Sequence, residues 1–361
     1  MPSTHRAEHF TLQAGVGAAK LIQQQGLSSD LIGSMVGASG GPKWLILSAL
    51  DQMLAGEFFK GRRKPIYTLG SSAGAWRHIA YGVNDNVAAI QRFEQAYIQQ
   101  RYETTPSPAE VTEEGRKILA QVLGANGISE LIHNPVWKTN LSAVRSKGLL
   151  ASENKILLGA GLLATALGNL SSRERLRHFF ERTVFSPDGG QNGGFHFDDF
   201  VTHQIPLTER NMLDAILASG SIPLVMEGIR NIEGAPDGMY RDGGFIDYHF
   251  DFKFDAPDGL ILYPHFYSHL SAGWFDKFTP WRRVSSRNLD NVVMISPSKS
   301  LVASLPGGKI PDRDDFKNLD NDSRIARWEQ VVEQGKKMAD EFYECWQKGS
   351  LADLTVSFDI N

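Results

Sequence analysis

Two stretches near the start of the chain each pass from an apolar segment through a glycine-rich loop into a helical pattern. The first spans residues 31–59 with its loop at 37–43, and the second spans 65–81 with its loop at 70–74. Two strand–loop–helix units in direct succession are typical of parallel sheets, because the helix carries the chain back to the edge where the next strand begins. The sequence therefore predicts an α/β fold with a mainly parallel sheet.

Apolar periodicity and turn residues give the remaining elements. No linker or repeat divides the chain, so a single domain over 1–361 is expected. Strands are predicted at 31–36, 65–69, 141–144, 239–241, 260–263 and 292–296. Helices are predicted at 11–30, 44–59, 75–81, 85–135 (with a capping box at Ser107 and Glu110), 171–183, 209–217 and 324–346, and loops at 186–194 and 311–322, the latter charged and expected to be solvated.

Composition excludes several classes of protein. The formal net charge of -4 gives no electrostatic footprint for nucleic acid, so no nucleic-acid partner is expected. The single cysteine, Cys345, excludes a disulfide framework and a zinc site built on several thiolates. The polar N-terminus lacks the apolar core of a signal peptide, and the chain is expected to be cytoplasmic. The apolar run at 156–167 is too short to span a bilayer and is interpreted as a buried core helix, with a membrane-interface face as the alternative.

Ser72 is the strongest candidate for a nucleophile. It stands in Gly70-Ser71-Ser72-Ala73-Gly74, directly after a predicted strand and directly before a predicted helix. A sharp strand-to-helix turn with small flanking residues presents a serine hydroxyl free of secondary structure, and the GxSxG pattern is typical of such an elbow. The helix N-terminus beside Ser72 favours developing negative charge. The alternative is a glycine-rich turn whose serine only caps a helix.

The earlier loop, Gly40-Gly41-Pro42-Lys43, is a candidate oxyanion hole. Paired glycines between a strand and a helix allow backbone N–H groups to point into a cleft, where they stabilise a tetrahedral intermediate. A phosphate site is the competing interpretation. However, Trp44 follows Lys43 where a P-loop has Ser or Thr, and the GxGxxG spacing of dinucleotide sites is absent.

The general base is either a histidine or an aspartate. None of the ten histidines, among them His78, His249 and His265, lies in a recognisable motif. An aspartate in a desolvated pocket also serves, because burial raises its pKa. Asp188 precedes two glycines within a turn-like loop. Asp242 precedes Gly243 and Gly244 after a predicted strand, which makes it the better candidate.

Together these segments resemble the patatin-like phospholipases, within residues 33–245. The resemblance implies a three-layer α/β/α fold, a Ser72–Asp242 catalytic dyad without a cofactor or metal, oxyanion donors at Gly40 and Gly41 supported by Lys43, and hydrolysis of acyl esters of lipids. The motifs that carry it are Gly40-Gly41-Pro42-Lys43, Gly70-Ser71-Ser72-Ala73-Gly74, Ala218-Ser219-Gly220-Ser221-Ile222-Pro223 and Asp242-Gly243-Gly244.

The chain departs from the family pattern at two places. Trp44 stands where a small residue is usual, and Phe245-Ile246-Asp247-Tyr248-His249 replaces a frequent Asn-Pro segment; residues 250–361 carry no family motif. Two alternatives remain, an α/β-hydrolase triad with His265 as its third member and an inactive lipid-binding scaffold. The expected partners are a lipid or other acyl-ester substrate and, transiently, a membrane surface. The aromatic segment 266–281 lines an acyl groove or belongs to the core.

Overall fold

The computed structural model describes residues 6–187, 189, 194–253, 259–279, 281–282 and 284–358. Most of the Asp188-Gly189-Gly190 triplet lies outside these residues. One sheet runs through the molecule in the order β11-β1-β10-β9-β2-β3-β4-β5-β6, with β7 and β8 attached beside β4. The strands are β1 Phe10–Ala14, β2 Ile32–Gly37, β3 Ile66–Ser71, β4 Trp137–Ser146, β5 Phe180–Ser186, β6 Thr202–Pro206, β7 Ile229–Arg230, β8 Met239–Asp242, β9 Leu260–Pro264, β10 Val292–Pro297 and β11 Thr355–Ser357.

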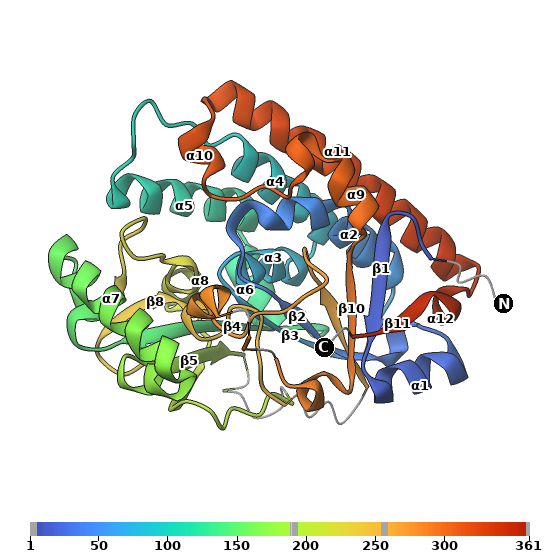
Figure 1. The fold of residues 1–361 in the computed structure, drawn as a ribbon, viewed down its shortest axis with the longest axis horizontal. Helices are drawn as coiled ribbons and strands as arrows, with labels where there is room; N and C mark the ends of the chain where they lie inside the picture. The colour runs from blue at the N-terminus through green and yellow to red at the C-terminus, as the bar shows by residue number, and fades with distance from the viewer. Residues whose placement is uncertain are drawn as a thin grey trace.

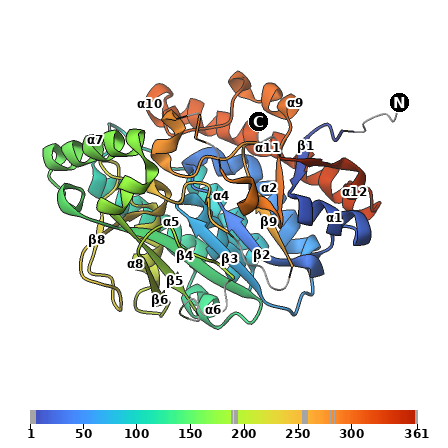
Figure 2. The same cartoon turned by 60° about the horizontal axis from the view of Figure 1, so that its bottom comes forward.

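The central strands β10, β9, β2, β3 and β4 run parallel to one another, whereas β1 is antiparallel to β10, and β5 and β8 are antiparallel to β4. Figure 2 shows β2, β3 and β4 side by side. Helices flank this sheet, and α2, α4, α5 and α11 pack together on one side of it (Figure 1). The α-helices are α1 Val16–Gln25, α2 Ser48–Met53, α3 Ala73–Gly82, α4 Asn86–Ile98, α5 Pro108–Leu123, α6 Gly127–His133, α7 Lys155–Ser171, α8 Met212–Gly220, α9 Lys299–Ser304, α10 Asp315–Asn318, α11 Asn321–Gln347 and α12 Leu351–Leu354.

Strand β4 separates two apolar cores, because successive side chains of a strand point to opposite faces of a sheet. Leu141 and Ala143 belong to the main core, whereas Val144 belongs to a smaller core with Leu158 of α7 and Phe180 of β5. Helix α8 packs on β4 from the main-core side. Helices therefore lie on both faces, and the predicted three-layer α/β/α arrangement with a mainly parallel sheet is confirmed.

Most predicted elements are found, and the capping box of Ser107 and Glu110 is present at the start of α5. The helix predicted at 11–30 is wrong in its first part, because residues 10–14 form β1 on the sheet and Gly15 separates that strand from α1. The helix predicted at 171–183 is also wrong. Its first half is a short 3-10 helix, Arg173–His178, and its second half is β5, whose Phe180 and Val184 are buried.

Two further predictions need correction. The segment 311–322 is not simply a solvated loop, because Asp315 is buried and accepts a hydrogen bond from Trp328 Nε1 at 3.0 Å. The apolar run at 156–167 forms the middle of α7, but only one face of this helix is buried. No helix in the described part of the chain is both long and apolar enough to cross a membrane.

Candidate active site

Two strands from distant parts of the sequence meet end to end along one edge of β4. Strand β3 runs parallel to β4 and places Ser71 opposite Ser142. Strand β8 runs antiparallel to β4 and places Asp242 opposite the next residue, Ala143. The other edge of β4 is occupied by β5 over this stretch, so β3 and β8 share one edge. Because neighbouring strand residues are about 3.3 Å apart, the register of β4 brings the ends of β3 and β8 together.

Ser72 lies at the turn from β3 into α3. Its backbone has φ 52° and ψ −129°, a conformation that costs a non-glycine residue on the order of 1–3 kcal/mol. Close packing holds the turn in place. A Cβ atom added at Gly74 would stand 2.0 Å from the Gly37 carbonyl oxygen, and one at Gly70 would stand 2.5 Å from the Ala75 nitrogen. Both positions of the GxSxG pattern therefore admit only glycine.

Asp242 is buried, and the Ser72 side chain is close enough to lower the pKa of its carboxyl group. Its Oδ1 also accepts a hydrogen bond from the Gly244 N–H at 2.7 Å. A Cβ atom at Gly243 would stand 2.4 Å from the Ser142 carbonyl oxygen and one at Gly244 2.5 Å from Ser39 Oγ, which explains the two glycines after this aspartate. Burial raises the pKa of Asp242 to about 6, against the lowering effects of the Ser72 and Gly244 hydrogen bonds and of Arg313 and Lys277. The carboxyl group is consequently ionised at neutral pH but able to take up a proton.

The segment 218–223 is hydrogen-bonded to the backbone N–H groups of both Ser72 and Asp242. Ser219 accepts hydrogen bonds from the Ser72 N–H, at 2.9 Å on its carbonyl oxygen and 3.0 Å on its hydroxyl. The Ser219 hydroxyl in turn donates to the Ser142 carbonyl at 2.8 Å. Two residues later, the Ser221 carbonyl accepts from the Asp242 N–H at 3.1 Å. This segment therefore fixes the backbones of both candidate catalytic residues.

The loop at Gly40 and Gly41 lies beside this pair. Ser39 Oγ is 2.6 Å from Ser71 Oγ, and the Ser39 N–H donates to the Tyr248 carbonyl at 2.9 Å. Gly41 has φ 56° and opens the 3-10 helix Gly41–Leu47, whose first N–H groups have no partner within the helix. Such groups are available to an oxyanion.

Three cationic side chains surround the site. Lys43 follows the two glycines, and partial burial lowers its pKa, an effect that Asp312 opposes. The stem of Arg313 lies 3.2 Å from the position of a Cβ atom at Gly41. Lys277 Nζ stands 3.8 Å from the centre of the Tyr248 ring, and burial of the amine, with Lys43 and Arg313 nearby, lowers its pKa to about 7. Sequence analysis missed Lys277 and Arg313, because both lie in the part of the chain without family motifs.

A buried ion pair between Arg182 and Asp247 fixes the backbone next to the candidate site. Asp247 receives hydrogen bonds from Arg182 Nε at 2.8 Å and Nη2 at 2.7 Å, and from the Ser142 hydroxyl at 2.8 Å. The Asp247 carbonyl accepts from the Ser71 hydroxyl at 2.6 Å. The departure from the family pattern at 245–249 therefore has a structural role. It anchors the strand ends beside Ser72, which no motif in the sequence indicated.

The candidate histidines are held in other contacts. His265 Nδ1 lies 2.6 Å from the Tyr267 carbonyl oxygen, and His249 Nδ1 accepts from the Ser271 N–H at 2.9 Å. Burial lowers the pKa of His265 to about 3 and, with His265 beside it, holds the pKa of His249 well below its ordinary value. Among the described residues, no hydrogen bond joins either ring to Ser72 or Asp242.

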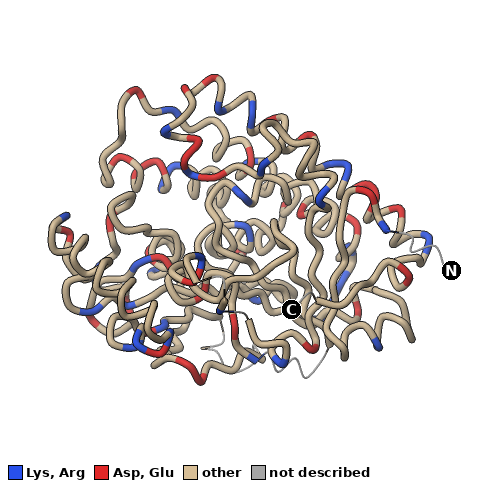
Figure 3. The backbone as a smooth tube through the Cα atoms, in the orientation of Figure 1, with Lys and Arg blue, Asp and Glu red and all other residues tan. Residues whose placement is uncertain are grey.

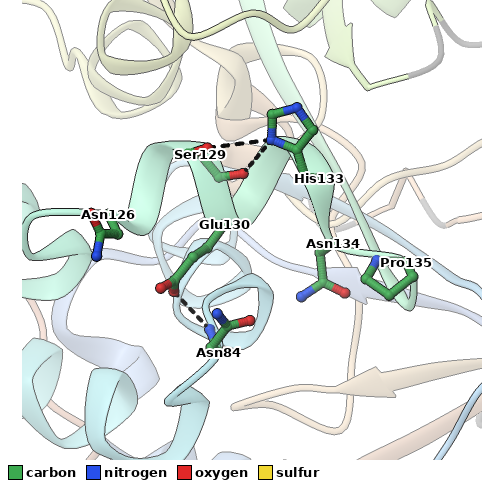
Figure 4. A pocket seen from close by; sticks show the side chains of 7 residues that line it. All are labelled: Asn84, Asn126, Ser129, Glu130, His133, Asn134 and Pro135. Carbon is green, nitrogen blue, oxygen red and sulfur yellow. Dashed lines mark hydrogen bonds between the residues drawn. The ribbon is translucent and has the colours of Figure 1, made fainter.

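A separate recess lies at the opposite end of α3 and β4 (Figure 4). Its lining includes Asn84, just after α3, and Asn134, just before β4. Ser72 lies before the first residue of α3, so the ten-residue helix places this recess roughly 15 Å from the dyad. Ligands of open α/β sheets bind at the carboxyl ends of the strands, where Ser72 stands. The recess at Asn84 is therefore not the candidate active site.

No protein-family model matches the chain, and no curated protein matches it. Among solved structures, VipD from Legionella pneumophila is similar to this chain, with a TM-score of 0.36 and 12% sequence identity over 97% of this chain and 72% of VipD. A likeness of this strength carries no inference about activity. The interpretation of the site depends on the residues and contacts described above.

Proposed function

We propose that this chain is a serine acyl-ester hydrolase of the patatin-like type, acting on lipids through a Ser72–Asp242 dyad. The observation that carries the proposal is that the register of β4 brings a serine in a strained elbow next to a buried aspartate whose pKa is raised to about 6. A base with a pKa near the working pH combines the correct ionisation state with a driving force for proton transfer.

In the proposed reaction, Asp242 accepts the proton of Ser72 as the hydroxyl oxygen attacks the ester carbonyl carbon. The N–H groups at Gly40 and Gly41 stabilise the resulting oxyanion, and Lys43 supports their loop. When the intermediate collapses, the C–O bond of the ester breaks, and the alcohol leaves with the proton from Asp242. Water then attacks the acyl-serine and gives its proton to Asp242. When this second intermediate collapses, the bond between the acyl carbon and the Ser72 oxygen breaks, Asp242 returns the proton to that oxygen, and the fatty acid is released.

The triad alternative receives no support from the histidine contacts. A base must reach the proton that it removes, and His265 is instead bound to Tyr267 with a pKa lowered to about 3. The scaffold alternative predicts an unreactive Ser72. The strained conformation of this serine favours the hydrolase, because such strain persists mainly where function requires it.

A fluorophosphonate probe tests the proposal. We expect the probe to label wild-type protein and to leave Ser72→Ala unlabelled, with matching losses of p-nitrophenyl ester hydrolysis. The matched control is His265→Ala, which we expect to retain activity if it folds. Labelling of Ser72→Ala, or loss of labelling in folded His265→Ala, contradicts the dyad.

The pH dependence gives a second test. Asp242 acts as a base only when ionised, so kcat/KM is expected to rise with pH through a midpoint at about 6. Lys277 and Arg313 favour the ionised form of Asp242. Replacing Lys277 with Met should therefore move this midpoint to higher pH, whereas a midpoint that does not respond argues against Asp242 as the titrating group.

A further inference from the structure

Helix α7 carries large apolar side chains on its exposed face as well as on its buried face. The residues Ile156, Leu163, Leu167 and Leu170 follow helical spacing along one stripe, and their exposed fractions are 81%, 63%, 61% and 54%. The opposite stripe is buried and includes Thr165 and Asn169. An ordinary surface helix places polar residues outward and apolar residues inward. Large leucine and isoleucine side chains aligned on the outside therefore indicate that another apolar phase covers this face.

A second segment that carries exposed aromatic side chains is tied to the buried face of α7. The 3-10 helix Trp274–Phe278 is tied to α7 by a hydrogen bond from Asn169 Nδ2 to Asp276 Oδ1 at 2.9 Å, and Arg282 binds both residues. Phe278 and Trp281 are exposed by 69% and 67%. Aromatic side chains of this kind are enriched where proteins meet the lipid–water interface. We define the docking surface as the α7 stripe together with Phe278 and Trp281.

The docking surface adjoins the candidate active site. Lys277 precedes Phe278 directly, and its amine interacts electrostatically with Asp242 while it covers the ring of Tyr248. Figure 1 shows α7 at the periphery of the molecule, away from the packed helices α2, α4 and α11. A lipid surface in contact with α7 would consequently lie next to the mouth of the Ser72–Asp242 site.

The charged residues around α7 indicate what kind of surface covers its exposed apolar face. In the segment 147–178, Lys147, Arg173 and Glu153 are ion-paired with residues outside the segment, which leaves three basic residues against one Glu in a chain whose net charge is -4. Along α7 itself the sole charged residue is Lys155, and Arg175 and Arg177 follow beyond its end (Figure 3). An apolar stripe between cationic ends matches an anionic membrane surface, where lipid head groups attract the basic residues and the apolar side chains enter the acyl boundary.

A second copy of the chain fits this surface poorly. In a twofold contact the same patch meets itself, so Lys155, Arg175 and Arg177 would approach the same basic residues of the other copy. Like charges placed together across an interface disfavour association. The 17 residues of α7 also fall short of a membrane span of about 20 residues, so the helix would lie in the interface plane.

We propose that the docking surface binds anionic phospholipid membranes and holds the Ser72–Asp242 site against the lipid layer. The binding itself is independent of the proposed hydrolase activity, whereas the presentation of substrate at the site rests on it. Docking by α7 places acyl esters beside the mouth of the site without requiring them to leave the membrane for bulk water.

Vesicle flotation tests the docking surface. The test variant is Leu163→Asp with Leu167→Asp, and the matched control is Val16→Asp, which changes an equally apolar side chain that is 83% exposed on α1. With vesicles of phosphatidylcholine containing phosphatidylglycerol, we expect wild type, Val16→Asp and Ser72→Ala to bind alike. The Leu163→Asp and Leu167→Asp protein should bind at least about tenfold more weakly, and salt should weaken wild-type binding.

Hydrolysis of a water-soluble p-nitrophenyl ester separates the two proposals. We expect the Leu163→Asp and Leu167→Asp protein to hydrolyse this ester like wild type, because neither side chain belongs to the site. Failure of wild type to bind anionic vesicles, or unchanged binding by the double variant, overturns the docking surface. A wild-type dimer in light scattering that the double variant converts to a monomer also overturns it, since α7 would then join two copies.

Discussion

At the scale of single residues, Asp242 shows how a functional group opposes the stability of its own fold. Its carboxyl group has an ordinary pKa of 3.8, and burial raises this pKa to about 6. Well below pH 3.8 the group is neutral in both the folded and the unfolded chain, and between pH 3.8 and about 6 it ionises first in the unfolded chain. As the pH rises through 6, the folded protein must hold a buried charge that the unfolded chain solvates freely. The ionised form therefore destabilises the fold at neutral pH.

Replacing Asp242 with Asn is expected to raise the free energy of unfolding at pH 8 by about 1–3 kcal/mol, while changing it little at pH 4. Urea denaturation at the two pH values measures the effect. Asp199→Asn is the control with the opposite sign. Burial disfavours the Asp199 charge, but Arg182 and Arg173 hold the pKa of Asp199 below its ordinary value. This variant should therefore lower the free energy of unfolding at pH 8 and nearly as much at pH 4, because the Asp199 contribution is lost only as the pH falls below 3.8.

Sequence reasoning at the residue scale works where backbone geometry restricts residue type. Gly70, Ser72, Gly74 and Asp242 stand at positions that the sequence singled out, and the structure brings Ser72 and Asp242 into contact. Their catalytic roles stay predictions. Lys277 and Arg313 were not predicted because surface lysines and arginines are frequent, and only the folded chain places these two beside Asp242.

At the scale of secondary structure, the contact between α3 and β2 fixes the position of the turn at Ser72. Gly74 on α3 packs directly on Gly37 at the end of β2. This approach brings the start of α3 to the loop that holds Gly40 and Gly41. A side chain at this contact would push apart the two strand–loop–helix units that carry the candidate nucleophile and the candidate oxyanion donors.

Gly74→Ala is therefore expected to lower the free energy of unfolding by about 3 kcal/mol and to abolish esterase activity. The matched control is Gly159→Ala in α7, where a Cβ atom meets nothing within 4 Å. There alanine should stabilise the protein by up to about 1 kcal/mol, because glycine is a poor helix former. Equal effects of the two substitutions, measured by urea denaturation, would contradict the packing at Gly37.

Errors in the predicted elements have physical causes. The segments 11–30 and 171–183 each mix two elements, and their apolar residues fit a helical period by coincidence. Strand β1 and strand β5 form only because the sheet supplies partners, β10 and β4, far away in sequence. Local periodicity does not contain this information. Strands such as β2 and β3 were predicted because glycine-rich loops delimit them.

At the scale of the whole molecule, the two ends of the chain are interleaved in one sheet. Strands β9 and β10 come from the last third of the sequence but lie between β1 and β2. Strand β11 completes the edge beside β1. The region 33–245, which holds every family motif, consequently lacks its neighbour on one side of β2.

A fragment of residues 1–253 is expected to be unfolded and unreactive, because removal of β9 exposes the edge of β2 to water and removal of α11 uncovers α2. Far-UV circular dichroism and fluorophosphonate labelling measure the two properties. Addition of a separately produced 254–361 fragment should restore labelling if the halves associate. A folded, labelled 1–253 fragment would show that the single-domain prediction for 1–361 is wrong.

The contact between the ends of β3 and β8 on β4 also determines when Ser72 and Asp242 come together during synthesis of the chain. Ser72 precedes Asp242 by 170 residues. At a synthesis rate of about 5–20 residues per second, the serine leaves the ribosome roughly 10–30 s before its partner. Strands β9 and β10 follow later still. Under the proposed mechanism, a growing chain therefore carries Ser72 without its proposed base, and ester hydrolysis begins only after the last strands have joined the sheet.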